Sequence, residues 1–338
     1  MEPRPKHIRA PELFGDFWFN SDPVSVRAHE GTVLLIDFWD YTSIHSIRTL
    51  PYVRDWFRKY DPLGMKIIGV HTPEFKFARN PEHVQKAIKR FGIGYPVVTD
   101  NDGIMWNAYG VRAWPTKFLI DKDGFIRYEH QGEGSYEQFE RALQSLLAEA
   151  GVRNGLPDLT LPVRETDEPG AVSFRATSDV YLGYLRGTIG NLEGYGAEST
   201  VEYVDHGLHL PGRFYAHGKW IMERESIRFC GSEGEEGYLS VTYQGIEANV
   251  VLEVASGRAA EVIVEQDDLP LNAENRGEDV QLVGGRSVID VDTPRMYSLV
   301  KNKEFGEHDL RIRFNTPGVS AYSFSFATSV ISDLVPRS

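Results

Sequence analysis

The stretch from Leu34 to Pro51 constrains the fold of this chain more than any other part of its 338 residues. A continuous apolar run follows Gly31, and such a run is typical of a strand buried in a parallel or mixed sheet. In Ile47–Tyr60 the apolar residues recur at helical spacing, which predicts a helix. Ser43 and Ser46 stand three residues apart at the predicted start of that helix. Backbone N–H groups and the helix dipole at such a place stabilise an anion, for example a thiolate.

The residues around the two serines, from Asp37 to Ser46, resemble the active-site segment of thioredoxin-fold proteins. The longer phrase, which continues to Pro51, resembles more narrowly the TlpA/DipZ-like redoxin family. Members of that family carry Cys-x-x-Cys where this chain has Ser43 and Ser46, and the resemblance implies a thiol-disulfide oxidoreductase whose first cysteine attacks as a thiolate. Serine cannot replace that cysteine, because a hydroxyl is hardly ionised near neutral pH and forms no disulfide. We therefore expect the fold of the family without its redox chemistry.

The resemblance assigns two further residues to the catalytic positions of the family. Asp37 lies inside the apolar run, so we expect a buried carboxyl with a raised pKa. In the family the matching carboxylate shuttles a proton for the second cysteine. Pro115, which follows Trp114, stands where the family has a cis-proline that faces the cysteine pair and shapes a groove for an extended partner segment. A simple proline at the start of a strand is the alternative.

We assign five residues to that binding groove: Trp39, His45, His71, Glu74 and Trp114. His71 and Glu74 belong to a His-Thr-Pro-Glu-Phe phrase that matches the family, and a structural cap is the alternative for both. His45 lies between the two serines. Residues so close together at a helix start do not line up a serine, an imidazole and an acid as a hydrolase requires. We therefore interpret His45 as an exposed turn residue.

The order of the elements predicted for residues 1–152 is the α/β thioredoxin plan with the redoxin insertion. Asn80 and Ser135 are the predicted N-caps of the two later long helices. The predicted elements after residue 10 are a short hairpin within 11–20, strands at 34–38 and 64–70, a helix at 81–91, a short edge strand at 95–100, a short helix at 104–109, a hairpin of 118–121 with 125–128, and a closing helix at 136–150.

A polar, proline-bearing segment, residues 153–171, reads as a linker. Within it, Leu159, Leu161 and Val163 suggest an extended arm that packs. From 172 to 332 helical periodicity disappears, and short runs of β-branched and aromatic residues alternate with glycine turns. This pattern predicts an all-β antiparallel sandwich domain. Separate strands are predicted, among others, at 238–243, 248–255, 295–300 and 308–314.

The second half also resembles the DipZ-like family, through Tyr181-Leu182-Gly183-Tyr184 and the phrase at 317–326. The resemblance implies a jelly-roll domain similar to galactose-binding or other carbohydrate-binding modules, and hence a carbohydrate partner. Aromatic side chains could form a stacking platform for a sugar, although core positions are expected for them in any sandwich. The candidates are Tyr181, Tyr184, Tyr215, His217 and Trp220.

The chain has 36 Lys and Arg against 49 Asp and Glu, a formal net charge of −13. Such a surface repels nucleic acid and anionic lipid, so neither is an expected partner. Cys230 is the one cysteine, which excludes an intrachain disulfide, and a packed side chain is its expected role. No metal-site or cofactor motif is present, so we predict no cofactor. Calcium binding stays an alternative, because oxygen ligands are available from the carboxylates of Asp267, Asp268, Asp290 and Asp292.

No apolar run long enough to cross a membrane occurs, and the start lacks the apolar segment of a signal peptide, so the chain as written is expected to be cytoplasmic and soluble. A chain that began after a removed N-terminal anchor would look the same and would work outside the cytoplasm. The leading hypothesis is a redox-inactive protein that binds another protein or a glycan. The alternative is a thiol-disulfide oxidoreductase whose Cys-x-x-Cys has been changed to Ser-x-x-Ser.

Overall fold

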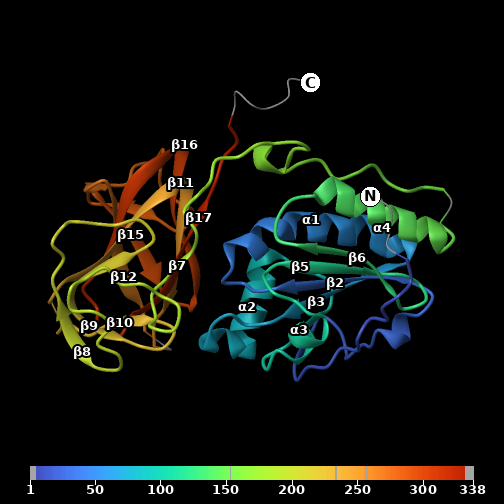
Figure 1. Cartoon of the computed structure of the whole chain (residues 1–338), viewed down its shortest axis with the longest axis horizontal. Helices are drawn as coiled ribbons and strands as arrows, with labels where there is room; N and C mark the ends of the chain where they lie inside the picture. The colour runs from blue at the N-terminus through green and yellow to red at the C-terminus, as the bar shows by residue number, and fades with distance from the viewer. Residues whose placement is uncertain (1–4, 153, 233, 256–257, 332–338) are drawn as a thin grey trace. The chain divides into compact units, whose positions relative to one another are not determined.

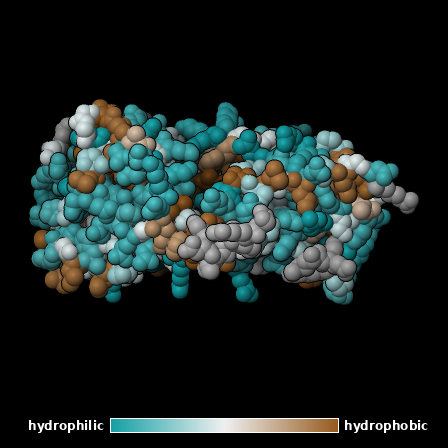
Figure 2. Space-filling view, turned by 90° about the horizontal axis from the view of Figure 1, so that it is seen from above, coloured by the Kyte–Doolittle hydropathy of each residue, from teal (hydrophilic) through white to brown (hydrophobic). Residues whose placement is uncertain are grey.

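The computed structural model describes residues 5–152, 154–232, 234–255 and 258–331. The chain divides into two compact units, residues 1–170 and 171–338 (Figure 1). The side of the molecule seen in Figure 2 is mainly hydrophilic, and its hydrophobic residues form small separate groups.

The first unit is built on a six-stranded sheet with the order β1-β4-β3-β2-β5-β6. Every residue of the central strand β2 is buried, as its apolar run predicts. Strand β3 pairs with β2 in parallel, and β5 pairs with it antiparallel. In sequence order the strands are β1 (Trp18–Phe19), β2 (Val33–Trp39), β3 (Met65–His71), β4 (Val97–Thr99), β5 (Thr116–Ile120) and β6 (Ile126–Gln131). The thioredoxin-like plan predicted for this part of the chain is therefore present.

Four α-helices of the first unit occur where the sequence predicts them: α1 (Ile44–Tyr60), α2 (Pro81–Phe91), α3 (Ile104–Ala108) and α4 (Tyr136–Glu149). Short 3₁₀ turns are at Arg27–His29, Asp61–Leu63, Lys76–Arg79 and Glu165–Asp167. Asn80 caps α2, because its side chain accepts a hydrogen bond from the Glu82 N–H at 2.9 Å. Ser135 precedes α4 but makes no side-chain capping bond, and its φ is 52°, so its predicted capping role is wrong.

Helices α1 and α4 pack against each other through aromatic rings. Trp56 stacks on Phe139 with ring centroids 5.0 Å apart, and Tyr52 stacks on Tyr136 at 3.6 Å. Helix α3 contributes Met105 to a different core cluster, on the other face of the sheet, with alternate residues of β2. The sheet is thus covered on both faces, which explains why β2 is apolar at every position except Asp37.

The start of the chain corrects two predictions. Residues 11–20 form no hairpin; β1 instead pairs antiparallel with β4, with Trp18 opposite Val98. Strand β4 therefore has a neighbour on each side and is not the edge strand that the sequence suggests. The partner of β1 is some eighty residues away along the chain, so no local pattern could identify it.

The second unit is mostly strands, and its strand pairs, apart from isolated bridges, are antiparallel. The longest are β11 (Gly237–Glu253) and β16 (Arg295–Phe314), which pair with each other along most of their length. The remaining strands are β7 (Val180–Tyr181), β8 (Thr200–Tyr203), β9 (Phe214–Met222), β10 (Ile227–Phe229), β12 (Ala260–Gln266), β13 (Leu269–Pro270), β14 (Gln281–Val283), β15 (Arg286–Val291) and β17 (Ser320–Ala327).

Each of these two long strands replaces a pair of shorter strands that the sequence predicts. Gly245 lies opposite Gly306 in the β11–β16 ladder, and the register shifts directly after Gly245. Glycine in a strand marks either a turn or a place where the strand bends and another backbone comes close. Here the strand continues through the glycine, so the prediction of turns at these positions is wrong.

Candidate functional site

The ends of three strands meet beside the start of α1. In the sheet register, Trp39 at the end of β2 lies opposite His71 at the end of β3, and Phe38 lies opposite Thr116 at the start of β5. Pro115, directly before Thr116, therefore comes to the same edge as the loop that carries the serines. The peptide bond between Trp114 and Pro115 is cis, which confirms that prediction.

The side chains of both serines accept hydrogen bonds from backbone N–H groups at the start of α1. Ser43 is its N-cap: it is partly exposed, and its Oγ accepts a hydrogen bond from the Ser46 N–H at 3.4 Å. Ser46 is fully buried, and its Oγ accepts from the Asp40 N–H at 3.2 Å. Ser43 is therefore the one of the two hydroxyls that a ligand can reach.

Asp40 organises the loop between β2 and α1, and the sequence analysis missed it. This buried carboxylate accepts from the Thr42 N–H at 3.1 Å, from the Thr42 hydroxyl at 2.8 Å and from the Glu74 N–H at 2.7 Å. His71 Nε2 lies 3.3 Å from its Oδ1. The available signal was an acidic residue placed directly after a buried strand, where a loop needs an acceptor for its free N–H groups.

Two residues predicted to line the groove lie beneath it. Trp39 and His71 have no exposed surface, which corrects the expectation that their side chains touch a partner. The His71 ring stacks on Tyr41 at 5.3 Å and meets Trp39 edge-on at 5.4 Å. The structural alternative is therefore the better description of His71. Glu74 is half-buried, and its backbone is tied to Asp40.

His45 belongs to α1 and is not a turn residue. Its Nδ1 lies 2.6 Å from Glu133 Oε1, and Arg48 Nε donates to Glu133 Oε2 at 2.7 Å. The His45 side chain is 44% exposed. Burial alone would raise the pKa of Glu133, but the hydrogen bond from His45 and the charge of Arg48 outweigh it and hold that pKa below its usual value. A carboxylate thus orients an accessible imidazole two residues from Ser43.

Asp37 is fully buried and its pKa is raised, as predicted. Burial raises it, and the ammonium of Lys117, 3.1 Å from Asp37 Oδ1, partly opposes the rise. Lys117 is itself buried and donates to Thr49 Oγ1 at 3.1 Å, while that hydroxyl donates to the Ser46 carbonyl at 3.0 Å. The sequence did not reveal this lysine, because it interrupts the apolar pattern of β5 by one residue only.

Trp114 forms one side of the site. It is half-buried, its Nε1 donates to the Thr72 carbonyl at 2.9 Å, and its ring lies 4.4 Å from the ring of Trp106. Two tryptophans held in this way give a rigid, partly exposed aromatic surface next to Pro115. Such a surface can bind apolar side chains of a partner segment.

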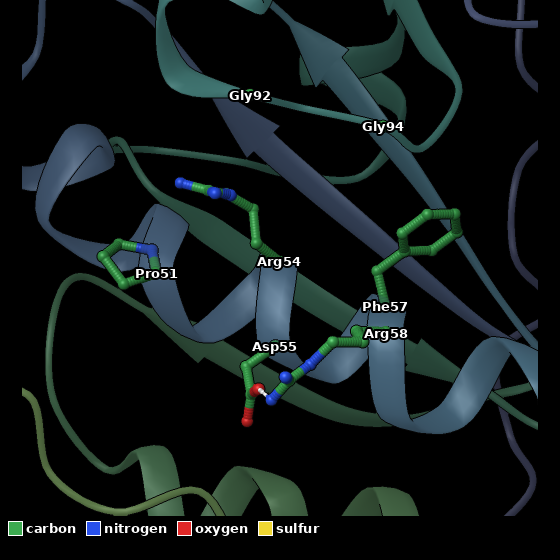
Figure 3. Close-up of a pocket in the computed structure, with 7 residues that line it drawn as sticks. All are labelled: Pro51, Arg54, Asp55, Phe57, Arg58, Gly92 and Gly94. Carbon is green, nitrogen blue, oxygen red and sulfur yellow. Dashed lines mark hydrogen bonds and ion pairs between the residues drawn. The ribbon is translucent and has the colours of Figure 1, made fainter.

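The first unit also has a hollow of about 470 Å³ on the side of α1 and the end of α2, away from the serines. Figure 3 shows Arg54 reaching toward Gly92, and Arg58 paired with Asp55. The hollow is lined by Pro51, Arg54, Asp55, Phe57, Arg58, Gly92 and Gly94. None of these residues was predicted to be functional.

Several aromatic candidates of the second unit belong to its core. Trp220 has no exposed surface and Tyr215 is 5% exposed, so neither can serve as a platform for a sugar. His217 is exposed and stacks on Tyr238 at 5.0 Å. The guanidinium of Arg186 lies 3.7 Å from the ring centre of Tyr181.

The remaining candidate, Tyr184, donates from its hydroxyl to Glu198 at 3.0 Å. Among the described residues, no group of three or more His, Cys, Asp or Glu side chains is placed to hold a metal ion. The carboxylates considered for calcium have other partners, since Asp267 binds His308 at 2.8 Å and Asp290 accepts from Gln281 at 3.0 Å. In the part of the chain that the structure describes, we also find no helix with the length and apolar character that crossing a bilayer requires.

Comparison with known proteins covers both units. Residues 11–129 match the AhpC/TSA family, and residues 177–327 match the family described as "Thioredoxin like C-terminal domain". Protein DipZ of Mycobacterium bovis is 28% identical over 325 residues, which are 94% of this chain and 42% of DipZ. The chain therefore spans less than half of the length of that relative.

Other relatives match a smaller part of the chain. Thiol-disulfide oxidoreductase ResA of Bacillus thuringiensis is 30% identical over 123 residues, which are 36% of this chain and 68% of ResA. A solved structure of a thiol-disulfide isomerase from Corynebacterium glutamicum aligns with a TM-score of 0.38 and 26% identity, and the alignment covers 41% of this chain and 97% of that one. The two family matches and the similarity to DipZ and ResA show that the chain belongs to the thioredoxin-like redoxin family, as a homologue of the DipZ and ResA proteins.

Proposed function

We propose that this chain is a redox-inactive binding protein, which holds an extended segment of a partner protein beside Ser43. The observation that carries the proposal is the chemistry at the start of α1. The two positions where the family resemblance places cysteines hold Ser43 and Ser46, and Cys230 is the one thiol of the chain. A dithiol–disulfide couple within the chain needs two cysteines, and Cys230, in the second unit, has no second cysteine to pair with.

The groups that remain at the site are suited to binding. A partner segment beside Pro115 would meet the paired rings of Trp114 and Trp106 and the exposed face of His45. The N-terminus of α1 adds positive potential there. These groups provide an apolar contact, an imidazole that can form hydrogen bonds, and a helix dipole. Binding through them requires no change of oxidation state.

Reduction of insulin disulfides by dithiothreitol is the direct test. We expect the unaltered protein to give no acceleration over dithiothreitol alone. The variant with Ser43→Cys and Ser46→Cys should accelerate the reaction if the rest of the site is intact. Both proteins are best compared in a Cys230→Ser background, so that the two introduced thiols are the only ones. Turnover by the unaltered chain would overturn the proposal.

A thiol-disulfide oxidoreductase is the second candidate function. It is supported by the ResA relative, which is a thiol-disulfide oxidoreductase, and by a site whose surroundings match the family. Under this reading Ser43 and Ser46 replace the cysteines of a natural enzyme. The natural coding sequence distinguishes the two candidates: cysteine codons at positions 43 and 46 would support the oxidoreductase, and serine codons would support the binding protein. An inactive double-cysteine variant with an intact fold would argue that the groove has acquired a different ligand.

For the second unit we propose carbohydrate binding, with His217 and Tyr238 as the aromatic contact. Their support is the stacked and partly exposed arrangement on β9 and β11, where Arg311 adds a guanidinium 4.9 Å from the ring centre of Tyr238. Sugars dock on such aromatic faces. A glycan array with the full chain tests this, with His217→Ala as the variant expected to abolish any signal. Absence of binding to every glycan would leave the unit a structural or protein-docking module.

We predict that the chain neither binds nucleic acid nor inserts into a membrane, on the grounds of its charge and hydropathy, and its cellular compartment stays a prediction.

A further inference from the structure

The segment that joins the two units is bound to the first of them. It leaves the end of α4 and returns along α1 and α4 (Figure 1). Its contacts are with polar groups. The Thr160 N–H donates to Glu140 at 2.7 Å, and the Val163 N–H donates to the Tyr52 hydroxyl at 2.7 Å. We call residues 157–167 the arm.

Two of the three apolar side chains expected to pack are exposed. Leu161 is 81% exposed and Val163 is 52% exposed, which corrects the expectation for these two, while Leu159 is half-buried. The attachment is by hydrogen bonds to buried groups. Glu140 has no exposed surface, and its carboxylate accepts from the Thr160 backbone and hydroxyl and from the Tyr60 hydroxyl. A buried carboxylate requires such donors, so the arm is an integral part of the folded first unit.

The far end of the arm reaches the helix that carries the serines. Arg164 Nη2 donates to the Arg48 carbonyl at 2.5 Å and lies 3.2 Å from Asp167 Oδ2. Arg48 Nη2 in turn donates to Thr166 Oγ1 at 3.4 Å. The Tyr52 hydroxyl donates to the same Asp167 carboxylate at 2.7 Å. Both the backbone and the side chain of Arg48 are thus held by the arm.

Arg48 is also the residue that shares Glu133 with His45. The Glu133 carboxylate takes Arg48 on one oxygen at 2.7 Å and His45 on the other at 2.6 Å. The Glu133 carbonyl oxygen lies 3.2 Å from His130 Nε2. A continuous line of contacts therefore runs from the arm through Arg48 and Glu133 to the exposed imidazole beside Ser43.

We propose that the arm is a positioning element of the binding site, and that Arg48 is the positioning residue through which it acts. The docked arm holds the Arg48 side chain against Glu133, and Glu133 fixes the orientation of His45. When the arm leaves, Arg48 loses the contacts that place it, and the imidazole loses its fixed orientation. The inference rests on the proposed function only in treating this site as the place where a partner binds.

The arm comes directly before the second unit in the chain. The arm ends at Asp167, and the second unit begins at Ala171. A pull on this connection would act first on Asp167, which contacts Tyr52 and Arg164, and then on Thr166, which contacts Arg48. The segment that joins the two units covalently is therefore also the segment that contacts Arg48 beside the site.

The test uses the full chain and follows the titration of the His45 imidazole by NMR, a readout that needs no partner. Thr160→Val removes the contacts of the Thr160 hydroxyl to Asp55 and Glu140, keeps the backbone N–H bond to Glu140, and does not touch Arg48, Glu133 or His45. Arg164→Ala removes the contact to Arg48 itself. Leu161→Ala is the matched control on the same arm. Exchange of the Val163 amide reports whether the arm is docked.

We expect the first two variants to raise exchange at Val163 and to change the His45 midpoint by at least about 0.3 pH unit, because the charges of Arg48 and Glu133 that face the imidazole are rearranged. The control should match the unaltered protein. If one substitution leaves the arm docked, the double variant Thr160→Val with Arg164→Ala is used. An undocked arm with an unchanged His45 titration would overturn the inference. Absence of partner binding by the unaltered protein, with the arm docked and the His45 titration dependent on it, would instead count against the proposed function.

Discussion

The ammonium of Lys117 lies 3.1 Å from the carboxylate of Asp37, and both side chains are buried beneath the first turn of α1. Burial raises the pKa of Asp37 in spite of this cation. The free-energy cost of removing the carboxylate from water therefore exceeds the gain from its pairing with Lys117, which is typical of buried ion pairs. The pair is tied to Ser46 through the Thr49 hydroxyl, so its charge state is a property of the site.

The first prediction concerns this pair. Lys117→Met leaves a buried carboxylate without its cation and should lower the free energy of unfolding at pH 7 by about 3–5 kcal/mol. Asp37→Asn leaves the ammonium unpaired and should cost a similar amount. The double variant should cost less than either single one. Urea unfolding of the four proteins checks this, and a double variant that loses the sum of the two single effects would contradict it.

The second prediction concerns acid stability. Because the folded pKa of Glu133 lies below the ordinary value of 4.5, the unfolded chain binds the proton more tightly than the folded chain. The contribution of Glu133 is therefore present above about pH 4.5 and is lost as the pH falls through the folded pKa. Glu133→Gln should lower stability at pH 7 by about 1–3 kcal/mol and flatten the acid limb. Glu137→Gln, on the surface of α4, is the control and should leave the profile unchanged.

The third prediction concerns the loop that presents Ser43. Asp40→Ala removes the acceptor of the Thr42 and Glu74 N–H groups and should cost about 2–4 kcal/mol, since buried donors are left without a partner. Asp40→Asn keeps one carbonyl acceptor and should cost less. Amide exchange at Glu74 should rise in the order unaltered protein, Asn variant, Ala variant. Equal exchange in all three would show that the carboxylate does not hold this loop.

The fourth prediction concerns the arm. A protein that ends at residue 170 should be more stable than one that ends at residue 152, by about 2–4 kcal/mol. The shorter protein exposes the carboxylate of Glu140 and the hydroxyl of Tyr52 after removing their partners. Thermal and urea unfolding of the two truncated proteins measure the difference. Equal stability would mean that the arm contributes nothing to the first unit.

The fifth prediction separates two facing glycines of the second unit. A Cβ on Gly245 would lie 2.9 Å from the backbone oxygen of Ala327, which cannot move without displacing β17. A Cβ on Gly306 would lie 2.9 Å from the ring of His308, a side chain that can rotate. Gly245→Ala should therefore cost about 1–3 kcal/mol, and Gly306→Ala should cost less. The reverse order in urea unfolding would refute this account of the bend.

Much of the first unit could be predicted from local pattern. The apolar run of β2, the helical spacing of α1 and the N-cap Asn80 each depend on residues close together in the chain, so their signals survive in the sequence. The fully buried Asp37 followed from the same logic, because a lone carboxylate within a buried strand has no route to water. The cis peptide before Pro115 was expected from the family resemblance rather than from pattern.

The partners of those residues could not be predicted. Lys117 meets Asp37 because β5 pairs with β2, and Glu133 meets His45 across 88 positions of sequence. In the sequence Asp40 cannot be distinguished from other loop carboxylates, and only the fold places hydrogen-bond donors around it. The sequence by itself determined the strand, the helix and the two serines at their junction, since these depend on short-range periodicity. Only the tertiary structure decided which charges face one another at that junction and that the arm holds Arg48, because sheet register and long-range packing are set by the whole chain at once.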